Sequence, residues 1–239
     1  MKSAKCMDGA RAASISIVME RILIIGASGG IGAALAAVGV ARGSEVVGLS
    51  RSRDGFDVTD EASIEVRLGA LSGQFDAIIV ATGALEVAGA APEKTVKALD
   101  PAAFLAQMQV NALGPLLVLK HGLRLLPKER RGVFAALSAR VGSIGDNRLG
   151  GWYSYRAAKA ALNQGLRTAA VEVARTHPKA VIAALHPGTV QTEFTEKYLG
   201  RHPAVPPEEA AANLWRVIDG LEAQDTGCFR DWRGEVVEW

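Results

Sequence analysis

Tyr155 and Lys159 are the two residues whose types and spacing best suit proton chemistry. Residues four apart in a helix lie on the same face, so the phenol and the ammonium would point the same way. A free tyrosine has a pKa of about 10 and is a poor acid or base at neutral pH. A lysine cation beside it stabilises the phenolate and lowers that pKa. Such a pair could give a proton to a carbonyl oxygen, or remove one from an alcohol.

A glycine-rich turn, Gly26-Ala27-Ser28-Gly29-Gly30-Ile31-Gly32, follows a short apolar run and opens an alanine-rich segment. That order of strand, turn and helix is the context in which such a motif binds a dinucleotide. Glycine lets the backbone approach a pyrophosphate, and the helix N-terminus offers unpaired N–H groups. The candidate cofactor-binding residues of the turn are Gly26, Ser28, Gly29, Gly30, Ile31 and Gly32. Their spacing fits two glycine patterns and does not distinguish subfamilies.

The end of the second expected strand bears on the choice of cofactor. Folds that bind NAD usually place an acid there to hold the ribose hydroxyls. This chain has Arg51 instead, and a guanidinium can pair bidentately with a 2′-phosphate. We therefore expect NADP(H) rather than NAD(H), with a further hydrogen bond from Ser28. Asp57 and Val58 are additional candidate cofactor-binding residues.

Apolar runs alternate with helical segments along the whole chain. We expect strands over 22–25, 46–49, 77–81, 133–137 and 181–185 and near 228–229, and helices over 31–42, 60–72, 101–126, 154–176 and 206–221. This alternation predicts an α/β fold: a single-domain, Rossmann-type, doubly wound parallel sheet with helices on both faces. Between Arg51 and Asp60 a full helix and strand barely fit, so a trimmed crossover is expected there.

Composition and charge argue against several classes of protein. The 239 residues carry a net charge of +2 with acids and bases interspersed, so no basic stripe suits nucleic acid. We expect no segment long enough to span a membrane, and the histidines and cysteines lack metal-ligand spacing. Cys6 and Cys228 suggest no disulfide framework, which favours a cytoplasmic protein. Residues 1–18 are predicted to be a flexible extension before Met19, and 19–239 the NAD(P)-binding domain.

Several motifs together resemble the short-chain dehydrogenase/reductase family, from about Glu20 to Trp239. The matching residues are the glycine turn, Val80-Ala81-Thr82-Gly83-Ala84, Asn111, the segment Tyr155 to Lys159, and His186-Pro187-Gly188-Thr189-Val190-Gln191-Thr192. The segments 141–144, 153–156 and 229–232 are similar to the C-factor or sniffer-like branch of that family. Separate motifs in the correct order are far more specific than any one of them.

The resemblance implies an oxidoreductase that interconverts a carbonyl and an alcohol. Tyr155 would be the general acid/base, and Lys159 would lower its pKa and hold the nicotinamide ribose. Asn111 would hold a water of a proton relay through its main-chain carbonyl. Pro115, four residues later, cannot donate to that carbonyl, so the helix should kink there and leave it free. The implied cofactor contacts are Ala81, Thr82, Gly83, Tyr155, Lys159, Pro187, Gly188, Val190 and Thr192.

The catalytic serine is where this chain departs from the family. Aligning residues 133–137 with the family's strand puts Ala139 at the position of that serine. Ser143 lies in a glycine-containing loop, 12 residues before Tyr155, and is the expected substitute. Ser138 is the alternative.

The substrate side is less defined. Residues 193–206 are expected to form a lid, with Leu85, Trp152 and Phe194 as pocket walls and His186 in a structural role. The expected partners are a small-molecule carbonyl or alcohol and, by resemblance, further copies of the chain in a homodimer or homotetramer. Alternatives are an NADP(H)-binding signalling or sensor protein of C-factor type with little turnover, an epimerase or dehydratase of the extended branch, and a structural oligomer with a vestigial site.

Overall fold

Six parallel strands form one sheet in the computed structural model, which describes residues 19–87, 89–193, 195–199 and 203–239. The strands are β1 Arg21–Ile25, β2 Glu45–Leu49, β3 Ala77–Val80, β4 Gly132–Leu137, β5 Ala180–His186 and β6 Cys228–Asp231, in the order β2-β1-β3-β4-β5-β6. All residues of β3 and β4 are buried, which explains why they are continuous apolar runs. The predicted extension, 1–18, lies outside the described residues.

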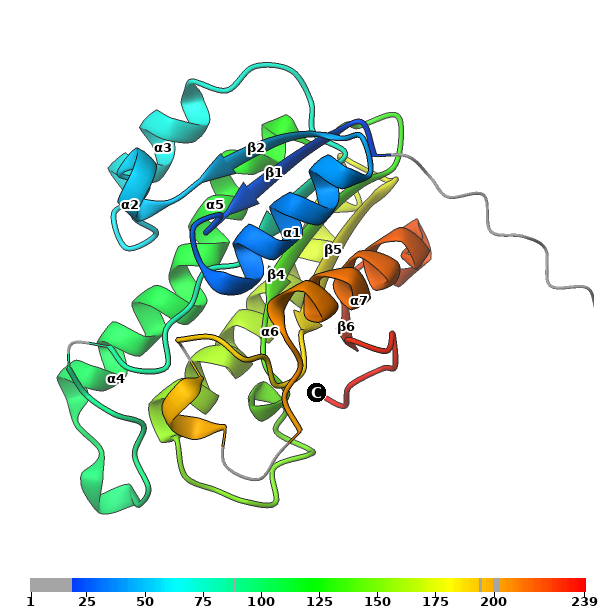
Figure 1. The fold of residues 1–239 in the computed structure, drawn as a ribbon. Coiled ribbons are helices and arrows are strands. Elements are labelled where there is room, and N and C mark those ends of the chain that lie inside the picture. The colour runs from blue at the N-terminus through cyan, green and yellow to red at the C-terminus, as the bar shows by residue number, and fades with distance from the viewer. Residues whose placement is uncertain (1–18, 88, 194, 200–202) are drawn as a thin grey trace, which may run out of the picture.

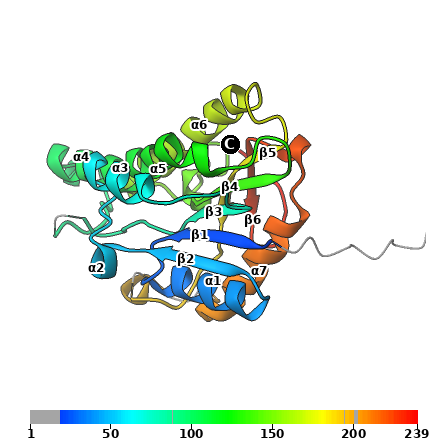
Figure 2. The ribbon, with the colours of Figure 1, turned by 90° about the horizontal axis from the view of Figure 1, so that it is seen from above.

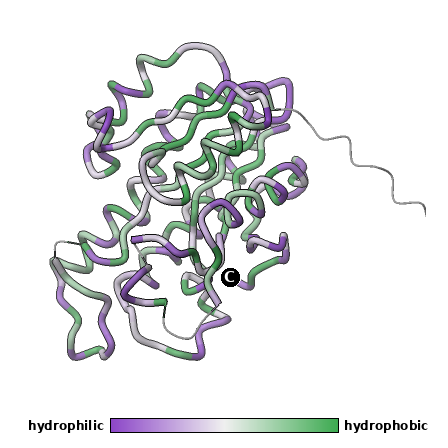
Figure 3. Tube along the Cα trace, in the orientation of Figure 1, coloured by the Kyte–Doolittle hydropathy of each residue, from purple (hydrophilic) through white to green (hydrophobic). Residues whose placement is uncertain are grey.

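Helices cover both faces of the sheet, which confirms the doubly wound fold (Figures 1 and 2). Helices α1 (Gly30–Ala41) and α7 (Pro207–Gly220) lie on one face. On the other lie α3 (Glu61–Gly69), α4 (Pro101–Met108), α5 (Gly114–Gly122) and α6 (Tyr153–Val173). Figure 3 shows the hydrophobic strands at the centre, between these two layers. Each face thus has its own apolar core.

The connection after β2 is trimmed, as the sequence predicts. A single helical turn, α2 (Arg51–Asp54), ends at Gly55, whose φ of 63° closes the turn. Phe56 and Val58 then enter the core directly, before α3 begins. The common Rossmann order places another strand outside β2, whereas β2 is the edge strand of the sheet described here.

The helix expected over 101–126 is divided into segments. Between α4 and α5 lies one π-helical turn, Gln109–Leu113, and a 3₁₀ turn, Leu123–Leu125, follows α5. Pro115 lacks the N–H that would continue α-helical bonding, so the backbone widens before it. The predicted disturbance around Asn111 is therefore present as a π-turn.

One sequence-based exclusion needs correction. The continuous helical stretch 101–125 has a mean hydropathy of 1.5 and is long and apolar enough to cross a membrane by length and composition. In the fold its segments pack against α6, α3 and β3, and packing of this kind also requires an apolar helix.

The remaining expected elements lie within three residues of the observed bounds. Four further 3₁₀ turns complete the described chain: Val96–Ala98, Arg140–Gly142, Glu196–Tyr198 and Ala223–Asp225.

Candidate active site

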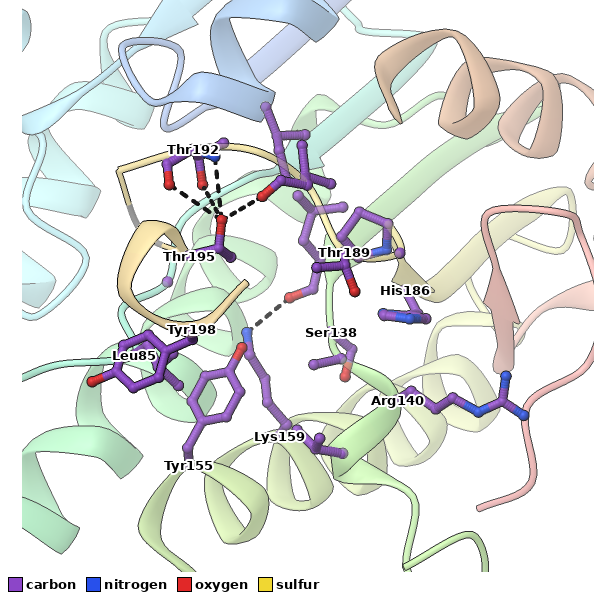
Figure 4. Close-up of a pocket in the computed structure, with 18 of the residues that line it drawn as sticks. Leu85, Ser138, Arg140, Tyr155, Lys159, His186, Thr189, Thr192, Thr195 and Tyr198 are labelled. Atoms are coloured by element: carbon purple, nitrogen blue, oxygen red, sulfur yellow. Dashed lines mark hydrogen bonds between the residues drawn. The ribbon is translucent and has the colours of Figure 1, made fainter. Parts of the chain in front are cut away.

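One cavity of about 1040 Å³ opens where the carboxyl ends of β1, β3, β4 and β5 meet. The glycine turn lines one end, Tyr155 and Lys159 line the middle, and the loop after β4 lines the other end (Figure 4). Ligands of open parallel sheets bind at this edge, because the loops after the strands converge there.

The glycine turn has the geometry of an anion site. Gly26 has a φ of 89°, and its N–H donates to the Leu49 carbonyl at 2.7 Å. A Cβ on Gly32 would lie 2.1 Å from the Gly26 carbonyl oxygen, so the turn tolerates no side chain there. Helix α1 starts after Gly29 without a side-chain cap, which leaves its first N–H groups for a ligand.

Most of the predicted cofactor-binding residues meet in this cavity. Its lining includes Ser28, Gly29, Gly30, Ile31, Ala81, Thr82, Gly83, Tyr155, Lys159, Pro187, Gly188, Val190 and Thr192. Gly26 and Gly32 shape the turn without lining the cavity. Arg51, Asp57 and Val58 lie outside the lining, beyond the end at Ser28.

The end of β2 nevertheless reaches the glycine turn. The Ser52 hydroxyl donates to the Ser28 hydroxyl at 3.1 Å. Arg51 is exposed, and no carboxylate of the described chain forms an ion pair with it. Hydrogen bonds from Thr59 hold the pKa of the Asp57 carboxyl below its usual range, and the charge of Arg51 lowers it further. Arg51, a cation without an ion-pair partner among the described residues, is thus the neighbour in sequence of the serine that contacts Ser28.

Tyr155 and Lys159 lie on the buried face of α6. The Lys159 ammonium donates to the Leu137 carbonyl at 2.9 Å and lies 5.8 Å from the centroid of the Tyr155 ring. A Cβ on Gly142 would lie 2.8 Å from the Lys159 Cβ, so the loop after β4 packs tightly on α6 at this point. Strand, loop and helix thereby place the ammonium beside the phenol.

Burial acts on the two groups in opposite directions. It raises the pKa of the Tyr155 phenol above its usual value and lowers the pKa of Lys159 to about 7. The lowered Tyr155 pKa expected from the sequence is therefore not found, because desolvation of the phenol dominates. The phenol is thus protonated at neutral pH, which is the form that donates a proton to a carbonyl oxygen.

Asn111 is fully buried and lies one layer behind the cavity. Its side-chain amide accepts from the Ala84 N–H at 3.2 Å and donates to the Ala84 carbonyl at 2.8 Å and to Gln107 Oε1 at 2.6 Å. Gln107 in turn donates to the Leu85 carbonyl at 2.7 Å. Asn111 and Gln107 together fix the loop after β3. Sequence reasoning missed Gln107, although its position one helical turn before Asn111 offered the signal.

The two candidate serines differ in where they point. Ser143 is buried, accepts from the Asp146 N–H at 3.0 Å and does not line the cavity. Ser138 lines the cavity (Figure 4). Its hydroxyl donates to Asn163 Oδ1 at 2.6 Å. The structure does not bring Ser143 to the phenol, because the turn from Ser143 to Asp146 fixes its hydroxyl elsewhere.

Aromatic rings wall the far end of the cavity. Trp152 has a φ of 52°, and no other non-glycine residue of the described ranges has a positive φ. Its ring meets those of Tyr155 and Tyr198 edge-on, at centroid distances of 6.2 and 5.6 Å. The main-chain carbonyl of Glu93 accepts from the Trp152 N–H at 2.5 Å, and its buried carboxylate accepts from the Ser154 N–H and hydroxyl. These bonds hold the strained turn. No pattern in the sequence singled out Glu93.

Leu85 also lines the cavity, whereas Phe194 and residues 200–202 of the expected lid lie outside the described residues. The described part of the lid bridges the cavity: Tyr198 donates to Glu86 at 2.7 Å, and Lys197 pairs with the same carboxylate. Thr195, which the sequence did not single out, bonds to Val190 and Thr192 and closes the turn before it (Figure 4).

The cavity suits a nicotinamide dinucleotide. Thr82 Oγ1 and His186 Nδ1 belong to lining residues, are buried and have no hydrogen-bond partner among the described residues. Orphaned polar atoms of this kind are costly unless a ligand satisfies them. Together with the uncapped helix N-terminus they fit a long, polar, anionic cofactor.

The family model described as short chain dehydrogenase matches residues 54–201, more than half of the chain. The chain belongs to the short-chain dehydrogenase family. It is therefore an NAD(P)-dependent oxidoreductase by family. The matched residues include Tyr155 and Lys159. The family resemblance seen in the sequence is therefore confirmed.

Individual members of this family extend the match. The 1-hydroxy-2-glutathionyl-2-methyl-3-butene dehydrogenase of Rhodococcus sp. (strain AD45) is 32% identical, covering 92% of this chain and all of the relative (100%). C-signal of Myxococcus xanthus is 35% identical over 59% of this chain and 81% of its own length. A crystal structure of a short-chain dehydrogenase/reductase from Burkholderia multivorans with bound NADP superimposes with a TM-score of 0.79, at 29% identity, covering 92% of this chain and 100% of the neighbour.

The burial of Lys159 predicts a pH-dependent effect on stability. Its pKa falls from 10.5 to about 7 on folding, so between these values the unfolded chain binds more protons and stability rises with pH. Lys159→Met removes the cost of burying the charge. We expect it to raise Tm by about 2–4 °C near neutral pH, equivalent to about 1 kcal/mol, with the gain shrinking towards pH 10.5. Thermal unfolding across this range measures it.

Lys179→Met is the matched control, because the exposed Lys179 also donates to a backbone carbonyl, that of Glu129 at 2.7 Å. A Tm difference for Lys159→Met that does not change with pH would contradict the assignment.

Proposed function

We propose that this chain is an NADP(H)-dependent oxidoreductase that interconverts a carbonyl and an alcohol, with Tyr155 as the general acid/base. The observation that carries the proposal is the position of Tyr155 and Lys159 on one buried face of α6. They line the middle of the cavity, between an anion-binding glycine turn and an aromatic-walled end.

The residues take complementary roles. The bound nicotinamide supplies or accepts the hydride. Tyr155 gives its phenolic proton to the carbonyl oxygen, and the Lys159 charge stabilises the phenolate that remains. Asn111 holds a water through its main-chain carbonyl, from which Pro115 withholds an α-helical donor. That water resupplies the proton.

Ser138 is proposed to orient the substrate oxygen in place of the serine that Ala139 replaces. Asn163 Nδ2 is buried and has no partner among the described residues. If the Asn163 side-chain amide rotated by half a turn, Nδ2 and Oδ1 would exchange places and Nδ2 would donate to Ser138 Oγ. The Ser138 hydroxyl could then donate its proton to a substrate oxygen in the cavity. Ser143 lacks any such access.

NADP(H) is favoured over NAD(H) by charge. The residues directly after β2 are Ser50 and Arg51 rather than an acid, and the Asp54 carboxylate nearby is bonded to Ser50. No carboxylate of the described residues forms an ion pair with Arg51, and the Ser28–Ser52 bond joins this region to the glycine turn. The Burkholderia neighbour holds NADP, which supports the same choice.

The signalling alternative has less support. C-signal matches little more than half of the chain, whereas the Rhodococcus dehydrogenase matches nearly all of it. The name of that dehydrogenase makes a glutathione-conjugated alcohol a sensible member of a substrate screen. A homodimer or homotetramer and a cytoplasmic location remain predictions from the resemblance.

Titration of the purified protein with NADPH and with NADH, followed by nicotinamide fluorescence, tests the cofactor. NADPH should bind at least about tenfold more tightly, because only it carries the phosphate that Arg51 can pair. Arg51→Ala should remove most of this preference, whereas Arg53→Ala, in the same helical turn, should change it less than threefold. Equal affinities in the wild-type protein would refute the cofactor assignment.

The decisive test of the reaction is Tyr155→Phe, assayed with NADPH and a panel of aldehydes and ketones. Loss of the proton donor should lower kcat by about 10²-fold or more while NADPH still binds. Tyr153→Phe is the control, because Tyr153 is exposed and does not line the cavity. Full activity of Tyr155→Phe would exclude the proposed mechanism.

The serine assignment predicts unequal effects of two substitutions. Ser138→Ala should lower kcat by about 10²-fold, as expected when one hydrogen bond to the reacting oxygen is lost. Ser143→Ala should mainly lower Tm, because it removes the acceptor for the Asp146 N–H. Steady-state kinetics and thermal unfolding of both variants decide; a larger kinetic loss in Ser143→Ala would restore the sequence-based choice.

A further inference from the structure

The end of the cavity beyond Tyr155 combines apolar walls with positive charge. Leu85, Val141, Leu149, Trp152 and Tyr198 supply the walls. Arg140 and Arg156 lie among them. Of the described lining residues, the one carboxylate is that of Glu193, which follows Thr192. Thr192 packs on the glycine turn, since a Cβ on Gly30 would lie 2.6 Å from its methyl carbon. The Glu193 carboxylate is thus at the end of the cavity opposite to the two arginines.

The two arginines are not equivalent. The Arg140 Nε donates to Asp146 Oδ2 at 2.6 Å, and this hydrogen bond raises the pKa of Arg140. Arg156 donates only to backbone carbonyls among its described contacts: Nε to Gly151 at 3.0 Å and Nη1 to Val141 at 3.3 Å. No carboxylate of the described residues lies in ion-pair distance of it.

Arg156 is partly buried, and this burial lowers its pKa. A partly desolvated guanidinium without a counter-ion is unfavourable, and an anion in the cavity would relieve that cost. Its two backbone bonds use one hydrogen on Nε and one on Nη1. The terminal edge of the fork, made by Nη1 and Nη2, retains the hydrogens that pair with both oxygens of a carboxylate.

We infer that Arg156 binds a carboxylate group of the substrate, so that the substrate class is an apolar or aromatic carbonyl compound, or its alcohol, that carries a carboxylate. Arg156 follows Tyr155 directly in α6, and both line the cavity. Because the walls at this end are apolar, an apolar or aromatic spacer would separate the reacting carbon from the carboxylate. The aromatic face of Trp152 suits such a spacer.

A purely structural role for Arg156 predicts a different result. Its backbone bonds join the loop after β4 and the turn before α6 to the helix. If that were its whole purpose, its loss would affect neutral and anionic substrates alike. The inference rests on the proposed function for its reaction, whereas binding of the carboxylate can be measured without turnover.

The kinetic test compares para-carboxybenzaldehyde with its neutral methyl ester, using NADPH. In the wild-type protein kcat/KM should favour the carboxylate by at least about tenfold. Arg156→Gln should reduce this preference to about twofold or less, mainly through KM, and Arg156→Lys should retain part of it. The control is Arg148→Gln, an exposed arginine of the same loop that does not line the cavity and should leave the preference intact.

The binding test uses calorimetry with the alcohol product, para-(hydroxymethyl)benzoate, and its methyl ester, added to the full chain with saturating NADPH, a combination that cannot react. The carboxylate compound should bind at least about tenfold more tightly than its methyl ester when residue 156 is a cation. In Arg156→Gln this difference in affinity should be absent. If this holds while neither aldehyde is reduced, the carboxylate site stands and the proposed function fails.

Reduction of both aldehydes without preference, or an equal loss for both in Arg156→Gln, would overturn the carboxylate site and leave the proposed function standing.

Discussion

The bond from the Lys159 ammonium to the Leu137 carbonyl joins the two halves of the active site. Leu137 is the last residue of β4, and Lys159 lies one turn after Tyr155 on α6. Because the ammonium is buried, it needs an acceptor, and the end of a central strand provides one. Gly142 is required nearby, since any side chain there would push the loop off the helix.

Two other constraints hold the opposite side of the tyrosine. Pro115 forces the helix that carries Asn111 into a π-turn, and the Asn111 side chain then grips the loop after β3. At the start of α6, the buried Glu93 holds Trp152 in a left-handed conformation. Both features cost conformational free energy and persist because neighbouring bonds compensate for them. They show that the tyrosine is positioned from three directions, by β4, by the loop after β3 and by the turn before α6.

The fold was largely predictable, because β3 and most of β1, β4 and β5 are continuous apolar runs, and several helices begin or end at a proline, an aspartate or a glycine. The glycine turn, Tyr155 and Lys159 were equally visible, since their chemistry depends on local spacing. The serine was not. Our proposal of Ser138 rests on its place in the cavity lining, which Ser143 does not share, and no periodicity in the sequence records that difference. The sequence analysis also overlooked that the stretch 101–125 is long and apolar enough to cross a membrane. Composition alone does not separate the two cases, because burial in a core and burial in lipid demand the same composition.

The sequence by itself determined the order of strands and helices, the anion-binding turn, the lack of an acid after β2 and the shared face of Tyr155 and Lys159. These follow from interactions within a few residues of each other. Only the tertiary structure decided which polar groups have partners. Arg140 and Arg156 look alike in the sequence, yet one meets Asp146 and the other meets only carbonyl oxygens. Such pairing depends on how the irregular loop between β4 and α6 folds back on the start of the helix, and no periodicity in the sequence records that path.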